Sequence, residues 1–254
     1  MVPLDDEAAA RVLAWDDAEP RSVSLRHALI HRCPGLWGDH PRTPRSVLLV
    51  RDVDDAEGWH VFGVGHAEPA IGWLAKQGRV FSLLAPEGWE GAIRKRSAMV
   101  ARGIVETWVR RDVPLVASTS VLTRPLTIDD ALAFRRTAPD WALRGWGTFD
   151  RLLASGAAFG VPTRDGGFAA VAWVFEADHD RDSIAVATVE WYRRLGLGRA
   201  VGAALIGHVE TVRRKAPLWT VADHNLASKA LARSLRFSPR AREIVLRWSL
   251  GIRL

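Results

Sequence analysis

The sequence predicts a mixed α/β fold in which helices flank a central mixed sheet. Three observations support this prediction. Short apolar runs of strand length alternate with segments of helical periodicity along the chain. One such run, residues 183–189, leads through a glycine-containing loop into a helical segment at 200–214. The 254 residues also suit one large or two medium domains with a buried core.

The first half, residues 1–117, is expected to fold as an α/β unit. Pro69 in the first turn of one segment suits a helix start. Gly63 and Gly65 in FGVGHAEP precede that helix without a flanking arginine, so we expect no phosphate site here. We expect helices over 5–15, 23–31, 68–77 and 87–99 and strands over 46–51, 59–63, 79–84 and 104–109.

The second half, residues 118–254, begins within the turn-prone connector VASTSVLTRP, residues 116–125. Thr127 and Asp130 make an approximate capping box for a helix that runs through Arg136. The turn PTRDGG joins two strand candidates into a hairpin. We expect further helices over 141–154, 200–214 and 225–237 and strands over 157–161, 167–175, 183–189 and 217–222.

The loop YRRLGLGR is the main functional candidate. Arg193, Gly196 and Gly198 form R-x-x-G-x-G, and two more arginines lie beside them. Glycine permits positive φ or a close approach of the backbone. The N–H groups and dipole of a helix start attract phosphate. The loop therefore predicts a phosphorylated ligand, and an ordinary tight strand-to-helix turn is the alternative.

The segment 188–237 resembles the GCN5-related N-acetyltransferase (GNAT) superfamily. Its signature is R/Q-x-x-G-x-G/A, followed by an Asn-led helix that ends near Gly-Phe. The run TVEWYRRLGLG is similar to the T-x-P-E-Y-R-x-x-G-L form of glycine N-acyltransferase-like proteins and bacterial GNAT acetyltransferases. The resemblance implies a GNAT fold, with acetyl-CoA or another acyl-CoA as co-substrate. It also makes the first half a degenerate GNAT-like half that shapes the substrate side.

The resemblance implies roles for individual residues. Thr188 and Val189 would pair with the pantetheine arm, and Asn225 and Ser228 would lie near the arm or the thioester. The pyrophosphate would bind to a loop made of Arg193, Arg194, Leu195, Gly196, Leu197, Gly198 and Arg199.

This sequence departs from the family pattern at three positions. The tyrosine that many members place seven residues after the Asn, to protonate the leaving thiolate, is Ala232 here. Arg236 replaces the glycine before the closing Phe, and Glu190 replaces the motif proline. Because neither of the last two changes touches the phosphate loop, the prediction of cofactor binding is firmer than any acid–base scheme.

Three carboxylates compete for the role of general base. Asp182 lies eleven residues before Arg193, the offset at which glycine acyltransferase-like enzymes place their catalytic glutamate. Glu190 lies at the strand end beside the loop, and Glu176 lies where the preceding strand stops. We expect Asp182 to accept the proton of an amine, directly or through water, and Ser228 or water to assist departure of the thiolate.

The expected reaction is transfer of an acetyl or other short acyl group to a primary amine of a small molecule or protein. The amine would attack directly, because Cys33 lies in the wrong half to be a nucleophile. Positioning and backbone donors to the thioester carbonyl would supply the catalysis. The alternatives are an acyl-CoA-binding regulatory or sensor protein with weakened chemistry, and a nucleic-acid-binding protein.

Composition bears on partners and location. The formal charge of +6 and the pI of about 10.3 favour anionic partners. The arginines are dispersed, however, so we expect a solvated basic surface with a local CoA site and no nucleic-acid partner. A single cysteine, an acidic start and the lack of a long apolar run predict a cytoplasmic protein with no membrane partner. Composition leaves open whether the protein is a monomer or a homodimer.

A metal ion is not expected. His27 and His31 share a helix face near Cys33 and His40, but their spacing matches no established zinc pattern. The acidic loop EADHDRD lacks the glycine and closing glutamate of a calcium loop, so we interpret it as a solvated hairpin tip, Asp182 excepted.

Two groups of tryptophans are distinguished by their expected surroundings. We expect Trp173 and Trp219 in the core. Trp146 and Trp191 are candidates for ligand contact, because aromatic side chains also line pockets.

Overall fold

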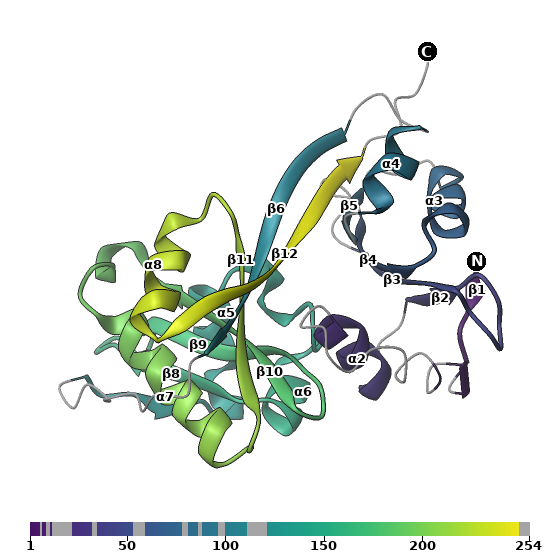
Figure 1. Cartoon of the computed structure of the whole chain (residues 1–254). Helices are drawn as coiled ribbons and strands as arrows, with labels where there is room; N and C mark the ends of the chain where they lie inside the picture. Colours follow the sequence, from purple (N-terminus) through teal and green to yellow (C-terminus); the bar gives the residue numbers. More distant parts are fainter. Residues whose placement is uncertain are drawn as a thin grey trace. The chain divides into compact units, whose positions relative to one another are not determined.

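The computed structural model describes residues 1–5, 7–8, 11, 22–31, 35–52, 59–77, 81–85, 88–95, 100–110 and 121–248 (Figure 1). The chain divides into two compact units. Unit 1 comprises Met1–Glu106 and Ala241–Leu254, and unit 2 comprises Thr107–Arg240. The boundary predicted between residues 117 and 118 lies outside the described residues.

In unit 1 an antiparallel strand pair leads into a parallel β-α-β crossover. β3 (Ser46–Asp52) pairs with β4 (Trp59–Gly65), and β5 (Phe81–Ala85) lies parallel to β4 after helix α3 (Ala67–Ala75). The sheet order is β1-β2-β3-β4-β5-β12. The other elements are β1 (Val2–Pro3), α2 (Ser22–Ile30), β2 (Leu36–Gly38), α4 (Trp89–Arg94) and parts of β6 (Val100–Arg110) and β12 (Phe237–Trp248).

Alternation along the strands gives unit 1 two apolar clusters. Leu48 packs in a cluster with α3 and α4, whereas its neighbours Val47 and Leu49 pack with α2. Because successive side chains of a strand point to opposite faces, this division places α2 on one face of the sheet and α3 with α4 on the other. Unit 1 therefore has helices on both faces.

Unit 2 is built on an antiparallel meander with one parallel strand. β8 (Ala158–Pro162), β9 (Phe168–Ala177) and β10 (Arg181–Thr188) are antiparallel neighbours, and β11 (Ala216–Ala222) lies parallel to β10. The order is β11-β10-β9-β8-β7. The other elements are β7 (Arg124–Pro125), η1 (Ile128–Asp130), α5 (Ala131–Thr137), η2 (Asp140–Leu143), α6 (Phe149–Ser155), η3 (Glu190–Tyr192), α7 (Leu197–Thr211) and α8 (Leu226–Ser234).

The core of unit 2 centres on β9. Its run AAVAWV is fully buried, as expected for a central strand with helices on both faces. Trp173 and Trp219 lie in this core, as predicted. Trp146 lies there too, with its Nε1 donating to the Val174 carbonyl at 2.7 Å, so it is a core residue and does not line a pocket.

The structure departs from the predicted elements at residues 141–154 and at β12, and it also contains the short strands β1, β2 and β7, which were not predicted. The helix expected over 141–154 is two short pieces, η2 and α6, separated by Gly147, whose φ is +78°. β12 was not predicted, because Pro239 and the charged residues of FSPRAREIVLRW hide its strand pattern. The capping box of Thr127 and Asp130 is confirmed.

Candidate functional site

The predicted phosphate loop forms the start of helix α7. Gly196 is the N-cap residue, with a φ of 77°, and a Cβ added there would meet nothing within 4 Å. Its requirement for glycine is therefore conformational. A Cβ on Gly198 would lie 2.9 Å from Thr188 Oγ1, so glycine lets the helix begin against the end of β10. The two glycines thus serve different purposes.

The loop offers both donors and positive charge to an anion. By helix geometry the N–H groups of Leu197, Gly198 and Arg199 have no intrahelical acceptor, since the first such bond runs from Ala200 N to Gly196 O at 3.0 Å. Arg193, Arg194 and Arg199 are exposed around them. Together with the helix dipole, this arrangement is suited to phosphate. The structure brings all seven predicted loop residues together.

Next to the loop, β10 and β11 diverge. Their parallel register runs from Arg181 opposite Ala216 to Ile184 opposite Trp219, and within these described strands it goes no further. β10 stays paired with β9 on its other edge up to Thr188. We call the opening between residues 185–188 of β10 and 220–222 of β11 the unit 2 wedge. The Thr188 carbonyl accepts from Arg193 Nε at 3.4 Å, and the other backbone groups on the open side could pair with a ligand that carries amides.

Ser228 and Trp219 are hydrogen-bonded beside the apex of this wedge. Trp219 is the last residue of β11 that pairs with β10, and its Nε1 donates to Ser228 Oγ at 3.0 Å. Because that oxygen accepts the indole proton, the hydroxyl proton of Ser228 is left to point elsewhere. The Asn225 side chain caps α8 by accepting from Ser228 N at 3.0 Å. Sequence reasoning found Ser228 but missed its link to Trp219.

The structure shows the surroundings of two residues that depart from the family pattern. Ala232, in the position of the family tyrosine, is fully buried on the inner face of α8 and offers no acid. Arg236 replaces the family glycine and has a left-handed φ of 70°. An arginine in this region is strained, which explains why glycine suits the position.

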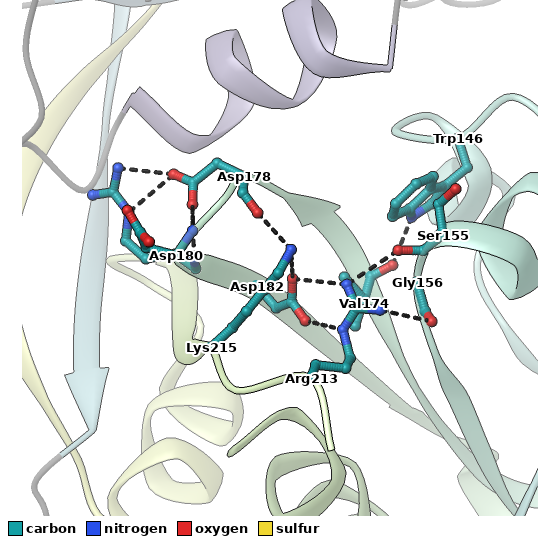
Figure 2. Close-up of polar contacts among 10 residues, drawn as sticks. Trp146, Ser155, Gly156, Val174, Asp178, Asp180, Asp182, Arg213 and Lys215 are labelled. Carbon is teal, nitrogen blue, oxygen red and sulfur yellow. Dashed lines mark hydrogen bonds and ion pairs between the residues drawn. The ribbon is translucent and has the colours of Figure 1, made fainter. Parts of the chain in front are cut away.

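The Asp182 carboxylate is buried between two cationic side chains. Its side chain is 0% exposed, and Figure 2 shows it between Arg213 and Lys215. Arg213 Nη2 donates to Oδ1 at 3.1 Å and Nε donates to Oδ2, while Lys215 Nζ lies 3.4 Å from Oδ1. Arg213 also donates to the carbonyls of Ser155 and Gly156. Both carboxylate oxygens are therefore occupied.

The position of Asp182 also separates it from the loop. It lies near the start of β10, about 20 Å along the strand from Thr188 at 3.3 Å per residue. Because Arg213 and Lys215 engage both carboxylate oxygens, we interpret Asp182 as a residue that ties the start of β10 to the segment after α7. Its role as general base stays a prediction.

The other acidic residues of this region divide by exposure. Asp178 is buried and accepts from the N–H groups of Asp180 and Arg181 at 2.9 and 2.7 Å, so the hairpin tip is not uniformly solvated (Figure 2). Glu190 is exposed in η3 beside the loop. Glu176 is buried within β9, opposite Ser183 and one residue from the apex of the wedge.

The other candidates of the sequence are a histidine pair in unit 1 and Trp191 next to the loop. His27 is buried in α2, with its ring centroid 4.6 Å from that of His31, and Cys33 lies outside the described residues. Within the described part of the chain no group of three or more metal-ligating side chains occurs. Trp191 is 83% exposed in η3, at the rim of the loop.

A helix start with a glycine loop, placed beside two diverging parallel strands, is suited to a phosphorylated ligand with an extended arm. Residues 128–242 match the model of the GNAT acetyltransferase family. The loop, the wedge and α8 all fall inside this match. The similarity to the GNAT acetyltransferase family in sequence therefore lies in the second half of the chain.

Solved structures extend the likeness in fold to the whole chain. A GCN5-related N-acetyltransferase-like protein from Streptococcus suis 89/1591 is 17% identical, with a TM-score of 0.71 over 95% of this chain and 98% of that one. A GCN5-related N-acetyltransferase from Kribbella flavida is 18% identical, with a TM-score of 0.63 over 97% of each chain. A tandem GNAT protein from the clavulanic acid biosynthesis pathway is 15% identical, with a TM-score of 0.59 over 97% and 93%.

These structures share the mixed α/β GNAT-like fold over both units. No curated protein matches the sequence. Among the described residues, no helix has the length and apolar character needed to cross a bilayer.

Proposed function

We propose that the protein transfers an acetyl or other short acyl group from acyl-CoA to a primary amine, with the whole cofactor site in unit 2. The observation that carries this proposal is the wedge between β10 and β11, which opens directly beside the R-x-x-G-x-G loop. The loop would hold the pyrophosphate, and Thr188 and Val189 would accompany the pantetheine arm. The thioester would then lie toward the apex, near Trp219.

Catalysis in this scheme is mainly positioning and polarisation. The amine attacks the thioester carbonyl, and backbone N–H groups on the open edge of β10 stabilise the charge that develops on its oxygen. The C–S bond then breaks and the thiolate leaves. Ser228 donates its proton to the thiolate and regains one from water, because the Trp219 indole donates to Ser228 Oγ and leaves the hydroxyl hydrogen to point away from the ring.

The base is assigned by comparing the positions of the three carboxylates that the sequence singles out. Asp182 is held by two cations, and Glu190 lies at the phosphate end of the strand. Glu176 is level with the apex in the register of β9 and β10. We assign the proton transfer from the amine to Glu176, through water, and place Glu190 at the rim of the cofactor site.

A second candidate is an acyl-CoA sensor that binds without turnover, which Ala232 in the tyrosine position favours. Release of free thiol from acetyl-CoA against a panel of amines and amino acids separates the two. The enzyme releases thiol with at least one acceptor, whereas a sensor binds acetyl-CoA in calorimetry and releases none.

Ser228→Ala tests the proposed acid. We expect turnover to fall by about 10²-fold, the low end for a general acid, with little change in CoA affinity. Trp219→Phe keeps an aromatic side chain and removes the N–H donor, so it should also lower turnover. Ser234→Ala on the exposed face of the same helix is the matched control. Wild-type turnover in Ser228→Ala would remove Ser228 from the mechanism.

A further inference from the structure

Unit 1 repeats the strand arrangement that forms the wedge of unit 2. The series β3, β4, α3 and β5 has the same pairing directions as β9, β10, α7 and β11. The parallel register of β4 with β5 ends at Phe62 opposite Leu84, while β4 continues to Gly65. We call the place where β4 continues beyond this register, residues 63–65 beside the end of β5, the unit 1 wedge.

Trp89 fills the unit 1 wedge. Its indole ring is so close that a Cβ on Gly63 would lie 2.5 Å from one ring carbon and 2.6 Å from the next. Its Nε1 donates to the Gly65 carbonyl at 2.9 Å, and the side chain is 3% exposed. The indole therefore covers the backbone of β4 and takes a carbonyl that could otherwise accept from the amide of a ligand.

Trp89 comes from the helix that corresponds to α8. It is the first residue of α4, which follows β5 as α8 follows β11. In unit 2 that helix carries the short side chain of Ser228 beside the wedge. A large aromatic residue on the equivalent helix of unit 1 thus occupies the space that unit 2 leaves open.

A small cavity adjoins the unit 1 wedge on the side of α2. Its volume is about 10 Å³, and it is lined by Leu25, Phe62, Gly63, Val64, Leu84 and Glu243. Such a volume holds about one water molecule. The first turn of α3 contains Glu68 and Pro69, which add a negative charge and remove an N–H donor, so it is unsuited to phosphate.

We propose that unit 1 holds a second arm-binding wedge that the Trp89 indole fills, so that the chain binds one acyl-CoA and not two. Removing the indole would open a site for an uncharged pantetheine arm, although not for the nucleotide. This inference rests on the proposed function of the unit 2 wedge, because it uses that wedge as its reference.

The test uses the full chain with the unit 2 wedge blocked by Gly198→Val, whose Cβ is forced against Thr188. Pantetheine is added to this variant and to the double variant that also carries Trp89→Ala, and the melting temperature of each is measured. At ten times its Kd, pantetheine should raise the melting temperature of the double variant by about 3 °C and leave Gly198→Val unchanged. Trp89→Leu replaces Trp89→Ala if the latter does not fold.

Calorimetry of the wild type supplies the second readout. We expect the wild type to bind one acetyl-CoA per chain. We also expect Trp89→Ala to keep this binding. Two acetyl-CoA per wild-type chain, or a folded double variant whose melting temperature does not respond to pantetheine, would overturn the inference. A wild type that binds no acetyl-CoA would instead contradict the proposed function, so the two failures are distinct.

Discussion

Asp182→Asn is expected to weaken the fold and to spare the chemistry. The carboxylate is 0% exposed and faces Arg213 and Lys215, whose side chains are 15% and 19% exposed. Breaking a buried ion pair by neutralising one partner costs about 3 to 5 kcal/mol, because the remaining charge is left uncompensated. Arg213 keeps its bonds to the Ser155 and Gly156 carbonyls, so we expect the lower end, about 3 kcal/mol.

Urea unfolding measures this loss, and acyl transfer to the best amine of the panel measures the chemistry. The urea midpoint should fall while the m-value stays the same. Turnover per folded molecule should stay within about 3-fold of the wild type, far from the loss of 10² or more typical of a missing base. Asp180→Asn, on an exposed neighbour, should change stability by less than about 0.5 kcal/mol. Unchanged stability with a 10²-fold loss of turnover would refute the structural assignment of Asp182.

Three further predictions concern stability. Arg124 donates to both oxygens of Asp130 at 2.7 Å and lowers the pKa of Asp130 from 3.8 to about 2, so this stabilisation is present above pH 3.8 and lost as pH falls through about 2. With Arg124 42% exposed, water screens the pair, and Asp130→Asn should remove about 1 kcal/mol in urea unfolding at pH 7 but not at pH 2. Burial, with a smaller effect of Arg213, lowers the pKa of His208 below 6.5. As the pH falls, the unfolded chain therefore takes up the proton before the folded chain does, so the free energy of unfolding should decrease below pH 6.5. His208→Gln should flatten that slope in urea titrations between pH 7.5 and 5.5. Arg236→Gly should raise the free energy of unfolding by about 1 kcal/mol, because it relieves a left-handed φ; a loss of stability would mean that the Arg236 side chain makes a contact of greater value.

The parts of the fold that sequence predicted best are those with a strong local pattern. The strand, glycine loop and helix from β10 to α7 follow from an apolar run, R-x-x-G-x-G and helical periodicity. β12 was not predicted, because charged residues alternate with its apolar residues and Pro239 interrupts the strand pattern. The break between η2 and α6 also depends on tertiary contacts, since Gly145 lies against the Phe175 carbonyl, which leaves no room for a Cβ.

The candidate site shows the same division between local and long-range information. The loop residues are adjacent in sequence, so their joint role could be predicted. The environment of Asp182 could not, because Arg213 and Lys215 lie about 30 residues away and no spacing rule pairs them with it. The same holds for the Trp219–Ser228 hydrogen bond and for the Trp89 indole against Gly63, which join separate elements.

Calorimetric titration of acetyl-CoA into the wild type and Gly198→Val tests most directly whether unit 2 holds the cofactor. A Cβ at position 198 must displace Thr188 at the mouth of the wedge, whereas Gly207, on the same helix, has open space around an added Cβ and provides the matched control Gly207→Val. We predict one acetyl-CoA per chain in the wild type, a loss of affinity of at least about 100-fold, or roughly 3 kcal/mol, in Gly198→Val, and no loss in Gly207→Val. Equal affinity in all three proteins would contradict the account.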